Sequence, residues 1–189
     1  MNRKCLQKFQ IKDVVFLAIM SAVALATCAV MPLVISLQPL IFGISQLVTA
    51  LQIGVFFAIG LYKVRKPGSL LIMALMMGLI QLMMSPPMFL SSVLNGVLIE
   101  LIVLLLFRGY EKDAAVFVAA MLHTPLSLPF NYLYNRLVKG ADSPLAAVAD
   151  RAPLAAVGMT LAVVAVSVLG ALIGIKIARE LKKSGVLKK

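Results

Sequence analysis

The chain has 189 residues, of which 62% are hydrophobic and 13% charged, and its mean hydropathy is +1.04. Because an ordinary globular domain is about half apolar and about a quarter charged, this composition argues against a water-soluble domain and indicates a membrane protein. The same numbers exclude a disordered chain, which requires low hydrophobicity and high charge. A net charge of +11 points either to nucleic acid or to the loop topology of a membrane protein, and the positions of the basic residues decide between the two.

Six apolar segments of about 20 residues follow one another along the chain, each long enough to cross a bilayer as a helix. Short polar or proline-containing connectors and one longer loop, 138–152, separate them. Six spans take up about 120 residues, which leaves no room for a soluble catalytic domain. We therefore predict an all-α integral membrane protein with a single six-helix domain over residues 1–189 and transmembrane helices at about 14–31, 40–62, 68–84, 88–107, 114–137 and 153–177.

The basic residues lie mostly on one side of these spans. Fifteen of the 18 Lys and Arg residues fall in the N-terminal segment, the second and fourth connectors and the C-terminal tail, whereas Arg136, Lys139 and Arg151 fall on the other side. Since cytoplasmic connectors carry the excess of Lys and Arg, both termini are predicted to be cytoplasmic. Charge spread in this way argues against a nucleic-acid-binding face.

The first and last spans each carry a row of small residues. Ala18, Ala22 and Ala26 repeat every four residues and form a smooth strip on the first helix, against which another helix can pack closely. Periodicity alone favours packing within the chain over contact with another protein. The Gly170-x-x-x-Gly174 pattern of the last span favours internal packing more strongly.

Two ionisable side chains are predicted to lie inside the membrane, where an unpaired charge is costly. Glu100 lies about 8 residues before Arg108, and His123 about 11 residues after Lys112, so both are at similar depth on consecutive antiparallel helices. A hydrogen bond between them is geometrically possible. Either the pair holds a ligand or a proton, or Glu100 stabilises helix packing through a hydrogen bond to a neighbour.

The segment that follows His123 contains Pro125 and Pro129, which lack backbone N–H groups and are predicted to interrupt the helix. A membrane tolerates such an interruption where protein or a cavity satisfies the freed carbonyl groups. Broken helices often line binding sites, so this segment is a candidate for one.

Uncharged polar side chains gather toward the outer side once the orientation is assigned. Any one of them can be an interhelical hydrogen bond, but several at similar depth on different helices predict a partly hydrated pocket that opens outward. Tyr132 and Tyr134, near the same surface, are either interfacial aromatic residues or pocket walls. The amide side chains are Gln46, Gln81, Asn95, Asn131 and Asn135, with Gln38 in the outer connector.

Motifs of several enzyme and transporter classes are absent from the sequence. It contains no GKS or GKT phosphate loop, no H-E-x-x-H and no G-x-S-x-G, and the spans contain no paired carboxylates. With one histidine and no intramembrane cysteine cluster, the 11 methionines do not indicate a metal site. We therefore predict no cofactor, no metal and no ATP hydrolysis by the chain itself, so that a partner supplies the energy.

The six spans, cytoplasmic ends and alanine row resemble the substrate-binding S components of energy-coupling factor (ECF) transporters, and the resemblance extends over nearly the whole chain. Two local patterns, R-K-P-G at 65–68 and N-G-x-x-x-E at 95–100, look like those of S components of the thiamine-precursor type and of related families. The sequence differs from several vitamin-binding members in having no tryptophan for aromatic stacking.

This resemblance implies a transport component rather than an enzyme, in the plasma membrane of a prokaryote: the subunit of an ABC-type importer that captures a vitamin or related micronutrient from outside. It implies that the alanine row contacts a transmembrane coupling subunit driven by two cytoplasmic ATPases, and that the protein topples in the membrane to release its ligand. Candidate ligand contacts are Gln46, Gln81, Asn95, Asn131 and Asn135, with Glu100 and His123 beneath them.

Several alternatives stay open at the level of sequence. The substrate is either a compact polar nutrient or a large tetrapyrrole or corrinoid, which His123 and the methionines can accommodate. Two other functions are a small intramembrane enzyme that uses Glu100 and His123 as acid and base, and a structural subunit whose small-residue rows pack partner proteins.

Overall fold

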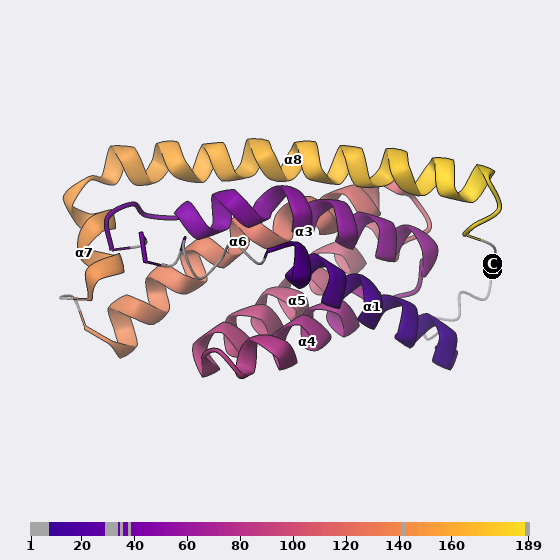
Figure 1. Cartoon of the computed structure of the whole chain (residues 1–189), viewed down its shortest axis with the longest axis horizontal. Coiled ribbons are helices and arrows are strands. Elements are labelled where there is room, and N and C mark those ends of the chain that lie inside the picture. Colours follow the sequence, from indigo (N-terminus) through magenta and orange to yellow (C-terminus); the bar gives the residue numbers. More distant parts are fainter. Residues whose placement is uncertain (1–7, 29–33, 35, 38, 141–142, 188–189) are drawn as a thin grey trace.

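The computed structural model describes residues 8–28, 34, 36–37, 39–140 and 143–187. Each of the six predicted segments contains a helix, and a further short helix, α7, lies in the region predicted as a long loop (Figure 1). The helices are α1 (Ile11–Thr27), α3 (Ile44–Lys63), α4 (Ser69–Leu82), α5 (Pro86–Phe107), α6 (Asp113–Val138), α7 (Pro144–Arg151) and α8 (Pro153–Lys183).

Four of the described helices, α3, α5, α6 and α8, are long and apolar enough to cross a membrane. With 14 and 17 residues, α4 and α1 are about 21 and 26 Å long, which is less than the hydrocarbon thickness of a bilayer. The shortness of α4 has a local cause, because Met83 and Met84 form a turn and Pro86 then opens α5. Proline is favoured there because the first helical residues have no intrahelical acceptor for an N–H group.

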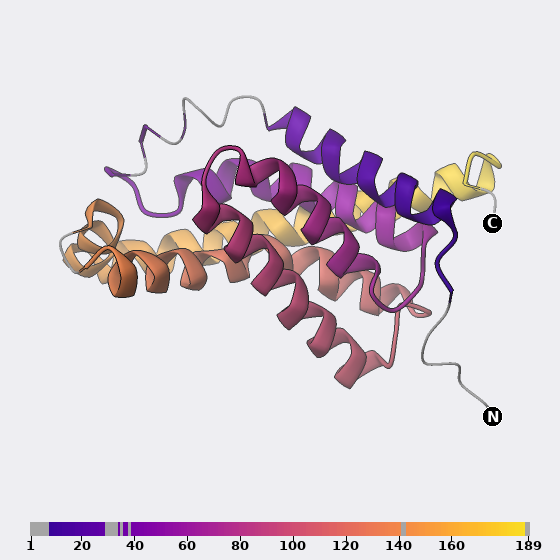
Figure 2. The ribbon, with the colours of Figure 1, turned by 90° about the horizontal axis from the view of Figure 1, so that it is seen from below.

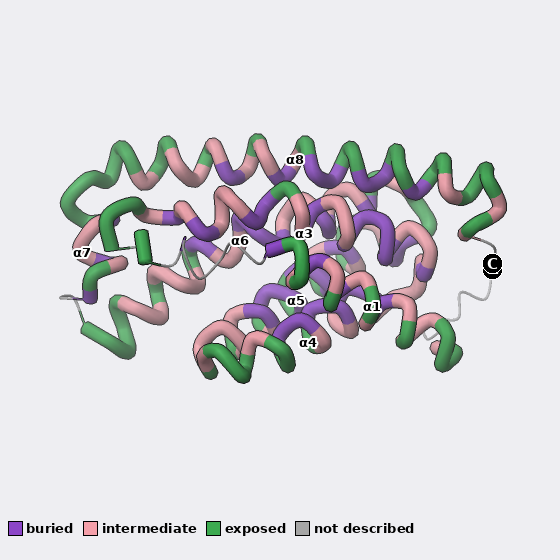
Figure 3. Tube along the Cα trace, in the orientation of Figure 1, coloured by how far each residue is buried: buried purple, intermediate pink, exposed green. Residues whose placement is uncertain are grey.

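The outer surface of the bundle is apolar, as a membrane environment requires. The most apolar stretch of α8 is only 22% buried within the protein, although its mean hydropathy is 2.4. Buried segments instead gather in the middle of the molecule, where α6 packs against α3 and α5 (Figure 3). Such an exposed apolar helix is unfavourable in water and favourable in lipid, so the fold supports an all-α integral membrane protein.

Close packing of α8 on α3 depends on glycine. A Cβ atom on Gly174 would lie 2.5 Å from the carbonyl oxygen of Val55 and 2.7 Å from the Cβ of Ala58, and one on Gly170 would lie 2.7 Å from the carbonyl oxygen of Leu51. The internal packing predicted for the Gly-x-x-x-Gly pattern is thus confirmed.

Basic and acidic side chains from distant parts of the chain meet at one end of the bundle, which we call the basic end. The starts of α1 and α6 and the ends of α3 and α8 lie there (Figures 1 and 2). Asp113 forms ion pairs with Arg65 at 2.5 Å and with Arg179 at 2.7 Å, and Asp13 pairs with Lys66 at 2.6 Å. The sequence predicts that the N-terminal segment, the second and fourth connectors and the C-terminal tail lie on one side of the membrane. Their described parts do lie together at this end.

Helix α6 runs unbroken from Asp113 to Val138 with Pro125 and Pro129 inside it, so the predicted interruption is wrong. The two prolines cannot donate to the carbonyl groups of Met121 and Pro125, four residues earlier. The helix nevertheless continues because its 26 residues pack against α3, α5 and α8, and this packing outweighs the loss of two backbone hydrogen bonds.

Candidate functional site

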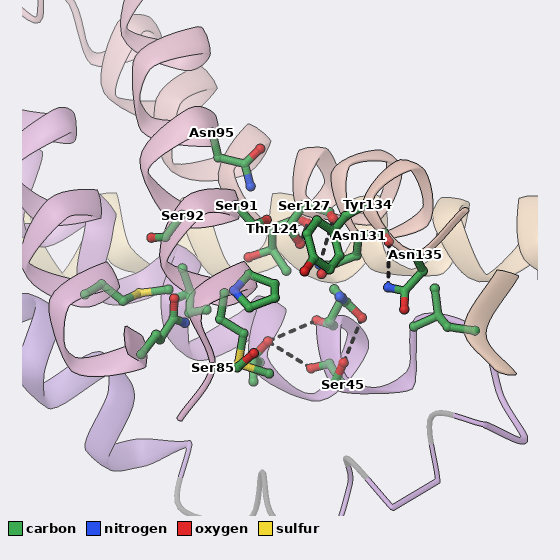
Figure 4. A pocket seen from close by; sticks show the side chains of 18 of the residues that line it. Ser45, Ser85, Ser91, Ser92, Asn95, Thr124, Ser127, Asn131, Tyr134 and Asn135 are labelled. Carbon is green, nitrogen blue, oxygen red and sulfur yellow. Dashed lines mark hydrogen bonds between the residues drawn. The ribbon is translucent and has the colours of Figure 1, made fainter. Parts of the chain in front are cut away.

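A cavity of about 380 Å³ lies in the half of the molecule away from the basic end. Its walls come from the end of α1, the first half of α3, the end of α4, the first half of α5, the middle and end of α6 and the start of α7. The volume is at the lower end of the range for ligand pockets, about 300–1,000 Å³. Its lining is rich in amide and hydroxyl side chains (Figure 4).

Six of the seven side chains predicted to contact a ligand line this cavity. Asn95 and His123 are buried, and the other four are partly exposed. They come from four helices, and the pocket that the sequence predicted from their similar depth does contain them. The six are Gln46, Gln81, Asn95, His123, Asn131 and Asn135, whereas Gln38 lies outside the described residues.

One face of α6 supplies a polar ladder with a spacing of four residues. It comprises His123, Ser127, Asn131, Asn135 and Lys139, all of which line the cavity. The Nδ2 atom of Asn131 donates to the carbonyl oxygen of Ser127 at 2.9 Å, and that of Asn135 to the carbonyl oxygen of Asn131 at 2.8 Å. Since Lys139 is exposed and His123 buried, the ladder runs from the mouth of the cavity to its floor.

The floor of the cavity consists of three buried polar side chains, Asn95, His123 and Thr124, which are 1%, 3% and 3% exposed. Asn95 Oδ1, both ring nitrogens of His123 and Thr124 Oγ1 have no hydrogen-bond partner among the described residues. Phe57 packs against the His123 ring with a centroid distance of 4.5 Å. Because buried polar atoms are nearly always paired, this cluster is unusual and is available to a bound molecule.

Charge is confined to the mouth of the cavity. Among the described residues that line it, Lys139 is the only charged side chain, and none is Asp or Glu. In the part of the chain that the structure describes, no three His, Cys, Asp or Glu side chains are grouped in a way that could hold a metal ion. The site therefore offers hydrogen bonds rather than ion pairs or metal coordination.

Hydroxyl groups that the sequence did not single out contribute much of the lining. Serine and threonine are common in membrane helices and often bond to their own helix backbone, as Thr49 does to the carbonyl oxygen of Ser45 at 2.9 Å. The sequence pattern does not identify these residues as cavity-lining, except for Ser127, which follows the four-residue spacing on α6. The serine and threonine residues that line the cavity are Ser45, Thr49, Ser85, Ser91, Ser92, Thr124 and Ser127.

Glu100 does not line the cavity, and the hydrogen bond to His123 that their similar depth made possible is not formed. Instead its Oε1 atom accepts a hydrogen bond from the backbone N–H of Gly68 at 2.6 Å, and its Oε2 atom accepts one from the Tyr110 hydroxyl at 3.0 Å. The two side chains face different neighbours, since Glu100 faces the start of α4 and His123 packs on Phe57 of α3. Glu100 therefore stabilises helix packing through hydrogen bonds to its neighbours, the second of the two interpretations that the sequence allowed.

The mouth of the cavity is bordered by a contact between α6 and α7. Asp150 of α7 forms an ion pair with Arg136 at 2.8 Å and accepts a hydrogen bond from the Tyr132 hydroxyl at 2.7 Å. Leu145 of α7 lines the cavity, as does Tyr134 of α6. Of the two tyrosines that the sequence left ambiguous, Tyr134 is a cavity wall and Tyr132 joins the two helices.

The alanine row of α1 faces outward. Ala22 and Ala26 are exposed and Ala18 is partly exposed, whereas Leu17 and Ser21 of the same helix are buried. Packing within the chain, which periodicity alone favoured, therefore does not explain Ala22 and Ala26.

Comparison with known proteins agrees with this membrane architecture. Residues 11–183, which include every described helix, match the model of a family described as hypothetical bacterial integral membrane protein (Trep_Strep). No curated protein and no solved structure matches the chain. The match to the family covers most of the sequence, and the chain therefore belongs to this family of bacterial integral membrane proteins.

Proposed function

We propose that this bacterial membrane protein is the substrate-binding subunit of an ECF-type importer, which holds a vitamin or similar small nutrient and delivers it with an ATP-driven partner module. The observation that carries the proposal is the polar cavity, whose floor contains buried hydrogen-bonding atoms without partners among the described residues. Such atoms destabilise a protein unless something pairs with them. A ligand that does so accounts for their presence, whereas a purely structural subunit does not.

In this proposal six helices cross the membrane, both termini are cytoplasmic and the cavity opens to the outside. The charges support this orientation, because the basic end and the cavity are at opposite ends of the bundle and basic segments prefer the cytoplasm. The short helices α1 and α4 can be accommodated by local thinning of the bilayer, at a modest cost in free energy.

The proposed partner contact is the outward-facing alanine row of α1, which would receive a helix of a transmembrane coupling subunit driven by two cytoplasmic ATPases. Exposed small side chains at four-residue spacing allow another helix backbone to approach closely. The enzyme alternative lacks comparable support, because its acid–base pair, Glu100 and His123, is not assembled.

Two measurements on the full-length protein test the proposal. Native mass spectrometry of protein purified from its host membranes is expected to detect a retained small molecule. Affinity purification is expected to co-isolate a membrane protein and an ATPase, and Ala22→Leu is expected to abolish this, whereas Ala165→Leu, an exposed alanine on α8, is the matched control. Absence of both a retained molecule and an ATPase, or partners that stay bound to Ala22→Leu, would contradict the proposal.

A further inference from the structure

We infer that the cavity selects an uncharged, compact nitrogen compound with an amide-type edge, in which a hydrogen-bond donor lies beside an acceptor, and that Asn95, His123 and Thr124 bind this edge. This inference rests on the proposed function, since it identifies the chemical class that the same cavity accepts. It follows from three properties of the cavity: which atoms are unpaired, which charges are missing and how large the cavity is.

The unpaired atoms determine the hydrogen-bonding pattern. Asn95 carries an acceptor oxygen beside a donor NH₂ group, and such a carboxamide pairs best with an edge that offers the complementary donor and acceptor side by side. An uncharged imidazole adds one donor and one acceptor, and the Thr124 hydroxyl can do either. The floor can therefore pair with a ligand that both donates and accepts hydrogen bonds. A simple carboxylate only accepts, so it leaves an acceptor atom such as Asn95 Oδ1 unpaired.

The missing charges exclude ionic ligands from the floor. No Asp or Glu is among the described residues that line the cavity, so a cation would be desolvated there without a counter-charge. Lys139, the one charged side chain among the described lining residues, is exposed and lies 16 positions beyond His123 at the end of α6, about 24 Å along the helix. An anionic group at the floor is therefore out of reach of this cation as well.

The size of the cavity favours a compact molecule. The cavity has a volume of about 380 Å³, near the lower limit for ligand pockets, which does not suit a tetrapyrrole or corrinoid. The His123 ring packs against Phe57 with an angle of 57° between the ring planes, so the imidazole is held by an aromatic neighbour while its nitrogens stay unpaired. A rigid donor–acceptor pair of this kind costs little conformational entropy on binding.

The test uses probes of equal size and different charge. Binding of benzamide, benzoate and benzamidine, which are neutral, anionic and cationic, is measured on the purified full-length protein in detergent by saturation-transfer NMR at millimolar concentration. Benzamide is expected to bind at least 10-fold more tightly than either ion. A second pair, 2-pyridone and N-methyl-2-pyridone, tests the edge, because methylation removes the donor and is expected to abolish binding.

Variants identify the floor as the site of recognition. Thr124→Val keeps the side-chain shape and is expected to weaken benzamide binding about 3- to 10-fold, the effect of one hydrogen bond. Ser167→Ala is the matched control, since its hydroxyl is equally buried and unpartnered among the described residues but does not line the cavity, and benzamide binding should not change. Asn95→Asp is expected to reverse the preference toward benzamidine, a gain that misfolding cannot imitate.

Each outcome has one meaning. Equal or tighter binding of benzoate or benzamidine, equal binding of the two pyridones, or no binding of any probe overturns the inference. If native mass spectrometry still finds a retained charged compound, the proposed transport function stands and this substrate class is wrong. If the protein retains no small molecule and co-isolates no ATPase, the proposed function itself fails.

Discussion

The backbone N–H of Gly68 donates a hydrogen bond of 2.6 Å to Oε1 of Glu100, which joins the start of α4 to the middle of α5. Gly68 has a φ of +91°, a conformation that favours glycine, and this turn directs its N–H group at the carboxylate. The two short patterns at 65–68 and 95–100 thus meet in one contact. The second carboxylate oxygen accepts a hydrogen bond from Tyr110, which is fully buried.

Glu100→Gln is expected to destabilise the protein by about 1–3 kcal/mol without affecting the cavity. A glutamine amide presents an NH₂ group where the carboxylate accepted a hydrogen bond from Gly68 or Tyr110, and leaves one buried donor unpaired. Thermal unfolding in detergent measures the loss. Ligand binding that disappears while the melting temperature is unchanged would instead make Glu100 a binding residue.

Tyr110→Phe is expected to flatten the alkaline limb of the stability profile. Burial is the main cause that raises the pKa of Tyr110 above its ordinary value, and the negative charge of Glu100 raises it further. The folded protein therefore holds the phenolic proton more tightly than the unfolded chain does. The stability contributed by this group is therefore present below about pH 10 and is lost as the pH rises further. Melting temperatures between pH 8 and 11 should fall less steeply in the variant than in the wild type, and parallel curves would count against this assignment.

Gly174→Ala is expected to destabilise the α3–α8 contact by about 1–3 kcal/mol, because the new methyl group would collide with the backbone of Val55, which cannot move aside as a flexible side chain can. Gly158→Ala in the same helix is the control, since a Cβ there meets no atom within 4 Å. Alanine is a better helix former, so this control should keep or raise the melting temperature. Equal losses in both variants would contradict close packing at Gly174 as the cause of the loss.

Asp113→Asn is expected to lower the melting temperature slightly and to make it less sensitive to salt. The side chains of Arg65 and Asp113 are 27% and 34% exposed, so water and salt screen their ion pair, which contributes at most about 1 kcal/mol. Glu180→Gln, in a more exposed pair with Lys183, is the control and should have a smaller effect. Melting temperatures in low and high salt measure both variants, and a wild type insensitive to salt would exclude an electrostatic role for the basic end.

The order and type of the helices could be predicted from the sequence because they depend on local properties. Apolar runs, prolines and the positions of Lys and Arg lie along the chain, and each predicted segment does contain a helix. Local rules failed where packing opposed them, as at Pro125 and Pro129, which α6 accommodates without a break. Local rules also did not predict α7, a short amphipathic helix in the segment expected to be a loop. Ser143 caps its start by accepting a hydrogen bond from the backbone N–H of Ala146.

Depth along a helix can be counted from a sequence, whereas the direction in which a side chain points depends on how each helix is rotated against its neighbours. The amides and His123 were predicted to gather in one half of the bundle, and six of them line one cavity because their helices happen to turn those faces inward. Glu100 was assigned a similar depth to His123 but points toward Gly68 instead. Composition and charge by themselves determined a membrane protein with a basic end, and only the tertiary structure decided which polar side chains meet, since helix rotation is set by close contacts such as those at Gly170 and Gly174.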